Sequence, residues 1–404
     1  MGHAAEPMRG NSEPEAQQGK KADRKRFRDA ALVAIACALL LVALNTTRAP
    51  LHNDFVEYWA AAHVLLAGGN PYSPSTMLAV EAATGRADKR PLLMWNPPWT
   101  LPFILPFGVL SYNWASAVWL LLNLVTVFAC GDFLWRQYAG DPRRRWLGWL
   151  LAASFFPLLT ALGLGQIGPL ILLGLTLFLR YQTKRPLLAG AATILIALKP
   201  QLLYLFWVAL LLENLQRPRW KLVAGVALAF LTATALPLLL NPKLLHQYLQ
   251  LAAGGAVLSN PSPAFGTLLR MRWGDHAWLQ FVPSFLGLGW AVIFWWTRRR
   301  EWNWPGYLPL LLLVSLVTTA YGWLFDQVVL LPALMQLAVP LARSARRLQL
   351  QTLIGYTGIS ALMVAFVLIR KTGTAYTWTA PAWLVLYLWV RRGTATQGAP
   401  LGIN

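Results

Sequence analysis

The stretch LHNDFVEYW, residues 51–59, lies just past the first long apolar run of the chain, residues 29–47. It holds two carboxylates, Asp54 and Glu57, among aromatic side chains. A carboxylate kept at a membrane surface costs free energy unless another group pairs with it or a reaction uses it. We therefore place the candidate site here, with Asp54 as the candidate general base.

Apolar runs separated by short basic loops continue from this stretch to the end of the chain. The 404 residues are 57% hydrophobic and only 12% charged, and the mean hydropathy is +0.47. About 25% charged residues is usual for a soluble domain. The 21 tryptophans suit a chain with many membrane–water interfaces. The sequence thus predicts an all-α, polytopic membrane protein.

Alternating these runs across a bilayer gives about twelve transmembrane helices with both termini in the cytoplasm. The expected spans are residues 29–47, 114–135, 146–163, 169–179, 187–197, 201–212, 222–240, 278–296, 305–320, 327–341, 348–369 and 378–390. Residues 99–110, interrupted by Pro102 and Pro106, are expected to form a re-entrant or half-length element. A full crossing there would move every later basic loop outside, against the positive-inside rule.

The expected organisation is a disordered basic cytoplasmic tail at 1–28 and one transmembrane domain at 29–404. Its first extracytoplasmic loop, 48–95, should carry interfacial helices near 55–66 and 75–84. A second large extracytoplasmic loop is expected at 241–277. The charged N-terminus lacks a small-residue cleavage site, which argues against a cleaved signal peptide.

The net charge of +20 is spread over short clusters between apolar runs. Membrane orientation accounts for this pattern, so no nucleic-acid partner is expected. Cys37 and Cys130 both lie in apolar runs, and the histidines lack metal-ligand spacing. We expect no disulfide framework, metal or cofactor. No phosphate-binding glycine loop is present, which favours a donor delivered by the membrane over a nucleotide sugar.

The expected outer acids are Asp54, Glu57, Glu81, Asp88, Asp275 and Asp326. Asp54 could take a proton from a sugar hydroxyl; alternatively it is an interfacial carboxylate paired with Arg48 or Arg90. Glu57, one turn further on, either supports the site or lies on a solvated face.

A phosphate leaving group needs cations, and the outer candidates are Lys199, Arg270 and Arg272. The alternatives are a snorkelling lysine and solvated loop arginines. Gln166, flanked by glycines in Gly165-Gln166-Ile167-Gly168, either contacts a sugar or caps a helix end.

Several short motifs occur together in a recognisable order between residues 50 and 275. They are Asp54-Phe55 through Tyr58-Trp59, LLAGGNPY at 65–72, Asn96-Pro97-Pro98, Gly165-Gln166, Lys199-Pro200, and Asn260-Pro261-Ser262 leading to Arg270. In these motifs the chain resembles glycosyltransferase family 87, polyprenyl-phosphate-mannose-dependent α-mannosyltransferases with a GT-C fold. After about residue 280 the likeness is limited to apolar spans.

The resemblance implies an inverting transfer in which Asp54 is the base. The donor would be a polyprenyl phosphate sugar, mannose by analogy, and the acceptor a glycolipid or glycan at the outer face of the plasma membrane. The residues implied in substrate binding are Lys199, Arg270, Arg272, Gln166, Glu57, Tyr58, Trp59 and Asn96. The prolines of Asn260-Pro261-Ser262-Pro263 depart from the family pattern, in which non-proline residues are more frequent, and could reshape the acceptor side.

Three alternatives stay open at this point. A related transferase would use another polyprenyl-linked sugar, such as arabinofuranose. A transporter or lipid flippase would place ionisable residues near the membrane midplane on broken helices, whereas the charges here lie at span ends. A catalytically inactive scaffold is the third.

Overall fold

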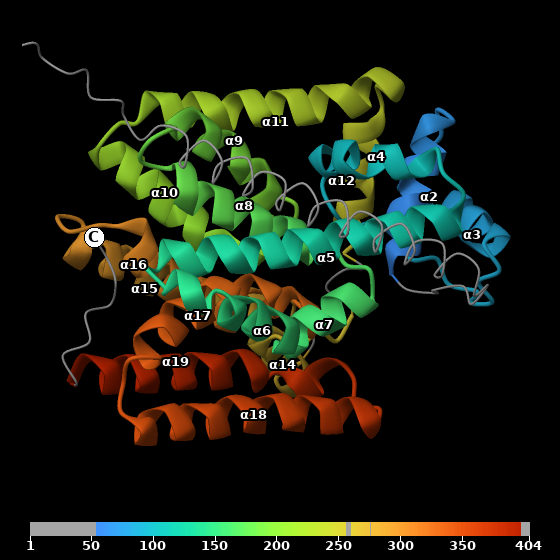
Figure 1. Cartoon of the computed structure of the whole chain (residues 1–404). Coiled ribbons are helices and arrows are strands. Elements are labelled where there is room, and N and C mark those ends of the chain that lie inside the picture. The colour runs from blue at the N-terminus through green and yellow to red at the C-terminus, as the bar shows by residue number, and fades with distance from the viewer. Residues whose placement is uncertain (1–53, 256–259, 275, 397–404) are drawn as a thin grey trace, which may run out of the picture. The chain divides into compact units, whose positions relative to one another are not determined.

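A computed structural model describes residues 54–255, 260–274 and 276–396 of the chain. Over these residues every regular element is a helix (Figure 1). The predicted tail at 1–28, the predicted span at 29–47, Arg48 and Asp275 lie outside the described residues.

The helices follow one another along the chain with short connections. The α-helices are α2 (Phe55–Leu66), α3 (Pro74–Ala83), α4 (Leu101–Gly108), α5 (Tyr112–Gln137), α6 (Trp146–Ser154), α7 (Phe156–Gly163), α8 (Gly168–Tyr181), α9 (Pro186–Ile196), α10 (Tyr204–Gln216), α11 (Trp220–Leu240), α12 (Leu244–Ala253), α14 (Phe265–Arg272), α15 (Val282–Arg298), α16 (Trp304–Thr318), α17 (Leu331–Leu341), α18 (Arg346–Leu368) and α19 (Thr379–Thr396). The 3₁₀ helices are η1 (Pro98–Thr100), η2 (Pro142–Arg144), η3 (Pro200–Leu203), η4 (Ala277–Phe281), η5 (Leu324–Leu330) and η6 (Gly373–Tyr376).

Five helical segments of the described chain are long and apolar enough to cross a membrane. They are Tyr112–Gln137, Trp220–Leu240, Ala277–Arg298, Leu324–Leu341 and Arg346–Leu368. The segments Pro142–Ser154 and Phe156–Gly163 make a sixth if they are one span, bent by 61°. The chain is therefore a membrane protein that is helical throughout the residues that the structure describes.

Other predicted spans correspond to shorter apolar helices. Pro186–Ile196 has 11 residues, about 16 Å at 1.5 Å per residue, roughly half of a bilayer core. Gly168–Tyr181 and Trp304–Thr318 are also below full span length. The count of about twelve crossings and the GT-C architecture stay predictions.

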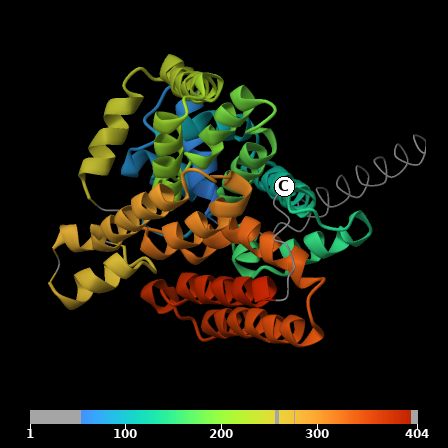
Figure 2. The same ribbon diagram turned by 90° about the vertical axis from the view of Figure 1, so that its left-hand side faces the viewer.

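The long helices lie alongside one another (Figure 1). The view in Figure 2 places the packed pair α18 and α19 on the opposite side of the bundle from α11. The close approach of α9 to α11 depends on two glycines. A Cβ on Gly190 would collide with the Leu222 carbonyl oxygen, and one on Gly225 with that of Leu187. Small residues let membrane helices pack at this separation.

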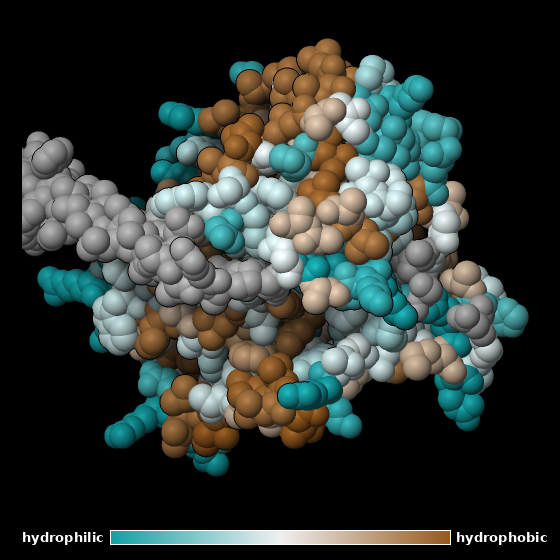
Figure 3. All heavy atoms as spheres, turned by 90° about the vertical axis from the view of Figure 1, so that its right-hand side faces the viewer, coloured by the Kyte–Doolittle hydropathy of each residue, from teal (hydrophilic) through white to brown (hydrophobic). Residues whose placement is uncertain are grey.

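Outward-facing leucines on α11, among them Leu228, Leu231 and Leu239, are exposed, as expected of helices surrounded by lipid. Figure 3 views the end of the molecule that carries α2 and α3. Hydrophilic residues gather in the middle of that face, and hydrophobic ones lie toward its top and bottom.

The first described helices agree closely with the sequence-based expectation. Helices predicted near 55–66 and 75–84 are found at Phe55–Leu66 and Pro74–Ala83. The α-helix within residues 99–110 is α4, which has eight residues and directly follows the short 3₁₀ helix η1, in agreement with a half-length element. Pro102 lies in the first turn of α4, where its missing N–H costs nothing.

Helix α2 is held firmly against α4 and α5. The Trp59 indole donates to the Leu110 carbonyl at 3.0 Å, and the Phe55 ring stacks on Trp119 with centroids 5.1 Å apart. A Cβ on Gly108 would meet the Ala62 backbone at 2.8 Å. This packing fixes the position of the residue that begins the helix, Asp54.

Candidate active site

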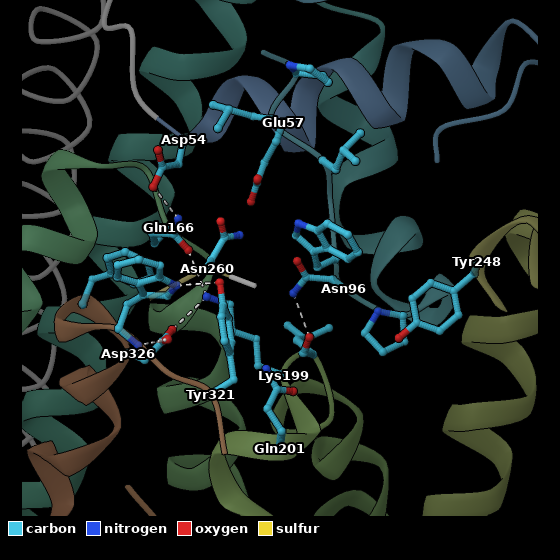
Figure 4. Close-up of a pocket in the computed structure, with 18 of the residues that line it drawn as sticks. Asp54, Glu57, Asn96, Gln166, Lys199, Gln201, Tyr248, Asn260, Tyr321 and Asp326 are labelled. Atoms are coloured by element: carbon cyan, nitrogen blue, oxygen red, sulfur yellow. Dashed lines mark hydrogen bonds and ion pairs between the residues drawn. The ribbon is translucent and has the colours of Figure 1, made fainter. Parts of the chain in front are cut away.

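A cavity of about 610 Å³ opens beside the start of α2. Segments far apart in the sequence meet there: the start of α2, the loop before η1, the α7–α8 turn, the α9–η3 turn and the loop after α16 (Figure 4). The lining residues are Asp54, Glu57, Arg86, Asp88, Arg90, Pro91, Leu92, Leu93, Trp95, Asn96, Pro97, Gln166, Leu198, Lys199, Pro200, Gln201, Tyr248, Asn260, Tyr321, Trp323, Phe325 and Asp326.

Two carboxyl groups enter the cavity from α2. Asp54 is the N-cap residue of the helix, and Glu57 lies three residues further on. Residues at this spacing share one face of a helix, and Figure 4 shows both side chains directed into the cavity. The predicted base thus lies in a pocket large enough for a sugar substrate.

Gln166 links Asp54 to Lys199 through hydrogen bonds. Its Nε2 donates to Asp54 Oδ2 at 2.7 Å, and its Oε1 accepts from the Tyr58 hydroxyl at 3.1 Å and from Lys199 Nζ at 3.0 Å. Two donors at the carbonyl end leave the amide only one favourable orientation, with the NH₂ group toward Asp54. Asp54 is therefore held by a neutral hydrogen-bond donor.

The turn that carries Gln166 is itself anchored. Gly165 has φ of +67°, a conformation that side chains disfavour. Its carbonyl accepts from the Trp119 indole at 2.8 Å, and the Gln166 backbone N–H donates to the Ala161 carbonyl at 2.8 Å. The glycine-flanked turn thus holds the Gln166 side chain in its orientation toward Asp54.

Lys199 lies between α9 and η3, next to an acidic partner. Its Nζ donates to Asp326 Oδ1 at 2.8 Å and lies 4.9 Å from the centre of the Phe325 ring. Asp326 Oδ2 accepts from the Trp323 backbone N–H at 2.8 Å, and the residue is 2% exposed. The partly buried ammonium is consequently balanced by a buried carboxylate.

Burial perturbs both carboxyl groups on α2. Burial raises the pKa of Asp54, and the Gln166 hydrogen bond and the Lys199 charge oppose that rise. The pKa of Glu57 is raised to about 8, chiefly by burial and then by the charge of Asp54. Glu57 therefore stays protonated at neutral pH and can donate a hydrogen bond there.

The structure brings some of the predicted site residues to the cavity and leaves others outside it. Asp54, Glu57, Asn96, Gln166 and Lys199 line it. Of the alternative partners for Asp54, Arg90 also lines the cavity, but the Asp54 carboxylate bonds to Gln166.

The remaining predicted residues do not line the cavity. Tyr58 is buried behind it and reaches it through Gln166. Trp59 turns away and stacks on His63. Arg270 is buried and Arg272 exposed on α14, and neither lines the cavity. Of the three predicted cations, Lys199 is the one that the fold places there.

Sequence reasoning missed two parts of the site. It counted Asp326 only as one of the outer acids, without a role. It also missed the cluster in which Arg86 donates to Glu81 at 2.6 Å and to Asp88 at 2.9 Å. An arginine near two acids in the segment 81–90 was a local signal for that cluster. Nothing local links Asp326 to Lys199, 127 residues away.

The described residues contain no group of three or more His, Cys, Asp or Glu side chains arranged to hold a metal ion. The polar groups of the cavity instead suit sugar hydroxyls and a phosphate: carboxyl groups, amides, cations and aromatic rings.

Comparison with known families gives the class of protein. Residues 94–325 match the model of glycosyltransferase family 87, more than half of the chain. The chain belongs to glycosyltransferase family 87. A family 87 glycosyltransferase needs a sugar donor and an acceptor, and the cavity is its candidate active site. No curated protein and no solved structure matches the chain.

The family match covers only part of the site of this family 87 glycosyltransferase. It includes Asn96, Gln166 and Lys199, but it begins after Asp54 and ends one residue before Asp326. The case for those two acids therefore rests on their positions in the cavity.

Proposed function

We propose that this family 87 glycosyltransferase moves mannose from a polyprenyl phosphate carrier to a glycolipid or glycan acceptor, with inversion. The reaction would take place at the extracytoplasmic face of the plasma membrane. One observation carries the proposal: a candidate base, Asp54, and a cation, Lys199, contact the same Gln166 side chain in one cavity.

In the proposed reaction, Asp54 removes the proton of the acceptor hydroxyl as its oxygen attacks the anomeric carbon. The bond between that carbon and the phosphate oxygen breaks, and polyprenyl phosphate leaves with the electron pair. Lys199 stabilises the charge that develops on the phosphate. A single displacement converts a β-phosphate linkage into an α-glycoside.

The other cavity groups suit sugar recognition. The Asn96 amide donates to the Leu198 carbonyl at 2.8 Å, so its side-chain oxygen is available as an acceptor for a sugar hydroxyl. A protonated Glu57 can donate a hydrogen bond to the same substrate. We assign no phosphate contact to Arg270 or Arg272, since neither lines the cavity.

The test is transfer by the purified protein from synthetic polyprenyl phosphate mannose to a lipid acceptor extract. Asp54→Asn should lower the rate at least about 100-fold, as expected for loss of a general base, while thermal unfolding stays unchanged. Asp141→Asn is the matched control, since Asp141 caps η2 and does not line the cavity. Normal turnover by Asp54→Asn would overturn the proposed base, and absence of transfer by the unmodified protein would overturn the donor.

A further inference from the structure

Lys199 already has an anionic partner before any substrate phosphate arrives. An ammonium group has three donors, and two of them point at Asp326 Oδ1 and Gln166 Oε1, 2.8 and 3.0 Å away. The third can meet a ligand oxygen in the cavity. A phosphate at Lys199 would therefore share the ammonium with the carboxylate of Asp326.

Asp326 cannot readily give way to such a phosphate. Its other oxygen is held by the Trp323 backbone N–H at 2.8 Å, and the residue is 2% exposed. It also lies in the first turn of η5, where its carboxylate caps the backbone N–H of Trp323, the residue before that helix. Its negative charge stays beside the phosphate position, where the low local dielectric strengthens repulsion.

The other cations of the described cavity lining are less suited to a phosphate next to Asp54. Arg86 donates to Glu81, to Asp88 and to the Arg90 carbonyl. Arg90 is exposed. Lys199 shares Gln166 with the candidate base, so it is the cation that a leaving phosphate would meet.

We propose that Asp326 competes with the phosphate for Lys199 and thereby promotes release of the polyprenyl phosphate product. This inference rests on the proposed function. The donor is a phosphodiester with one negative charge, whereas the product is a monoester whose second ionisation begins near pH 6. The extra charge strengthens the attraction of the product to Lys199. Asp326 opposes that increase, and product release limits turnover in many enzymes.

The direct test is equilibrium binding of polyprenyl monophosphate to the purified full-length protein. Asp326→Asn should bind this probe about tenfold more tightly than the unmodified protein, because the repulsion is removed. Asp326→Glu keeps the charge and should stay near the unmodified affinity. Asp326→Ser, whose hydroxyl can still accept from the Trp323 N–H, should tighten binding as Asn does.

If the role of Asp326 were purely structural, its substitution would weaken the binding of polyprenyl monophosphate, because a misplaced Lys199 would bind phosphate more weakly. Unchanged or weaker binding by both Asp326→Asn and Asp326→Ser overturns the inference. Glu213→Gln is the matched control and should leave binding unchanged. Glu213 is a carboxylate that accepts from the Trp304 indole at 2.7 Å, outside the cavity.

Two further measurements separate this inference from the proposed function. Lys199→Ala should weaken binding of polyprenyl monophosphate but not of the uncharged polyprenol. If Lys199→Ala bound the monophosphate as tightly as the unmodified protein does, the phosphate site at Lys199 would be rejected. In kinetics, Asp326→Asn should keep its single-turnover rate while steady-state turnover falls and inhibition by polyprenyl phosphate strengthens. A loss confined to the single-turnover rate would contradict a role in release.

Discussion

Asp54 and Lys199 come from segments 145 residues apart, yet each bonds to the same side-chain amide, that of Gln166, at 2.7 and 3.0 Å. The amide donates to the Asp54 carboxylate and accepts from the Lys199 ammonium, so it separates two opposite charges while fixing the position of both. An active site that pulls a proton from one substrate and stabilises charge on another needs this separation.

Gln166 should therefore set the basicity of Asp54. Its hydrogen bond lowers the pKa of Asp54 against the effect of burial, so Gln166→Ala should raise that pKa and move the acid limb of the pH–rate profile to higher pH. We expect kcat/KM on the acid side of the profile to fall about tenfold or more, measured as sugar transfer. Gln182→Ala, in the turn after α8, is the control. A profile that drops in height without shifting would contradict this role.

Glu57 should make stability depend on pH. Its pKa is raised from 4.5 to about 8 in the folded protein. Below pH 4.5 it is protonated in both states, and between 4.5 and 8 only the unfolded state ionises, so its contribution to stability is lost as pH rises through that window. Glu57→Gln should become progressively more stable than the unmodified protein from pH 5 to 8 and the gain should then level off.

Thermal unfolding in detergent at several pH values measures this effect. Glu301→Gln, at an exposed position, should show no such trend. A difference between Glu57→Gln and the unmodified protein that stays constant with pH would rule out the raised pKa.

The α9–α11 contact should depend on the reciprocal glycines. Gly190→Leu places atoms where the Leu222 carbonyl lies and should destabilise the protein by about 3 kcal/mol or more, at the upper end of overpacking. Gly358→Ala on α18, where an added Cβ meets nothing within 4 Å, should be neutral or slightly stabilising. Equal unfolding temperatures for the two variants would show that the helices do not pack this closely.

The proposed outer location of the site can be tested with a single cysteine. Ser75 is exposed at the start of α3, and Ser75→Cys should react with a membrane-impermeant thiol reagent in intact cells. Cys130 is buried and should not contribute; Cys37 is replaced by Ser. Labelling only after the cells are opened would place the site on the cytoplasmic side.

The local elements near the site were predictable because their signals are local. Apolar periodicity followed by Gly and Pro marks the end of α2, and Pro102 with Pro106 marks the short α4. Membrane character follows from the apolar composition, and helical structure follows in turn because a helix satisfies its own backbone hydrogen bonds within lipid. The number of crossings was less accessible, because short apolar runs such as Pro186–Ile196 have no unique assignment from sequence.

The amino-acid sequence by itself determined the membrane-protein class, the helices around Asp54 and, through short motifs, the glycosyltransferase family. Only the tertiary structure decided which residues surround Asp54. It placed Gln166 and Lys199 in the cavity, turned Trp59 away and left Arg270 and Arg272 outside the lining. The physical reason is that helix formation depends on residues close together in the sequence. A charge pair such as Lys199 and Asp326 depends instead on how segments far apart in the sequence pack.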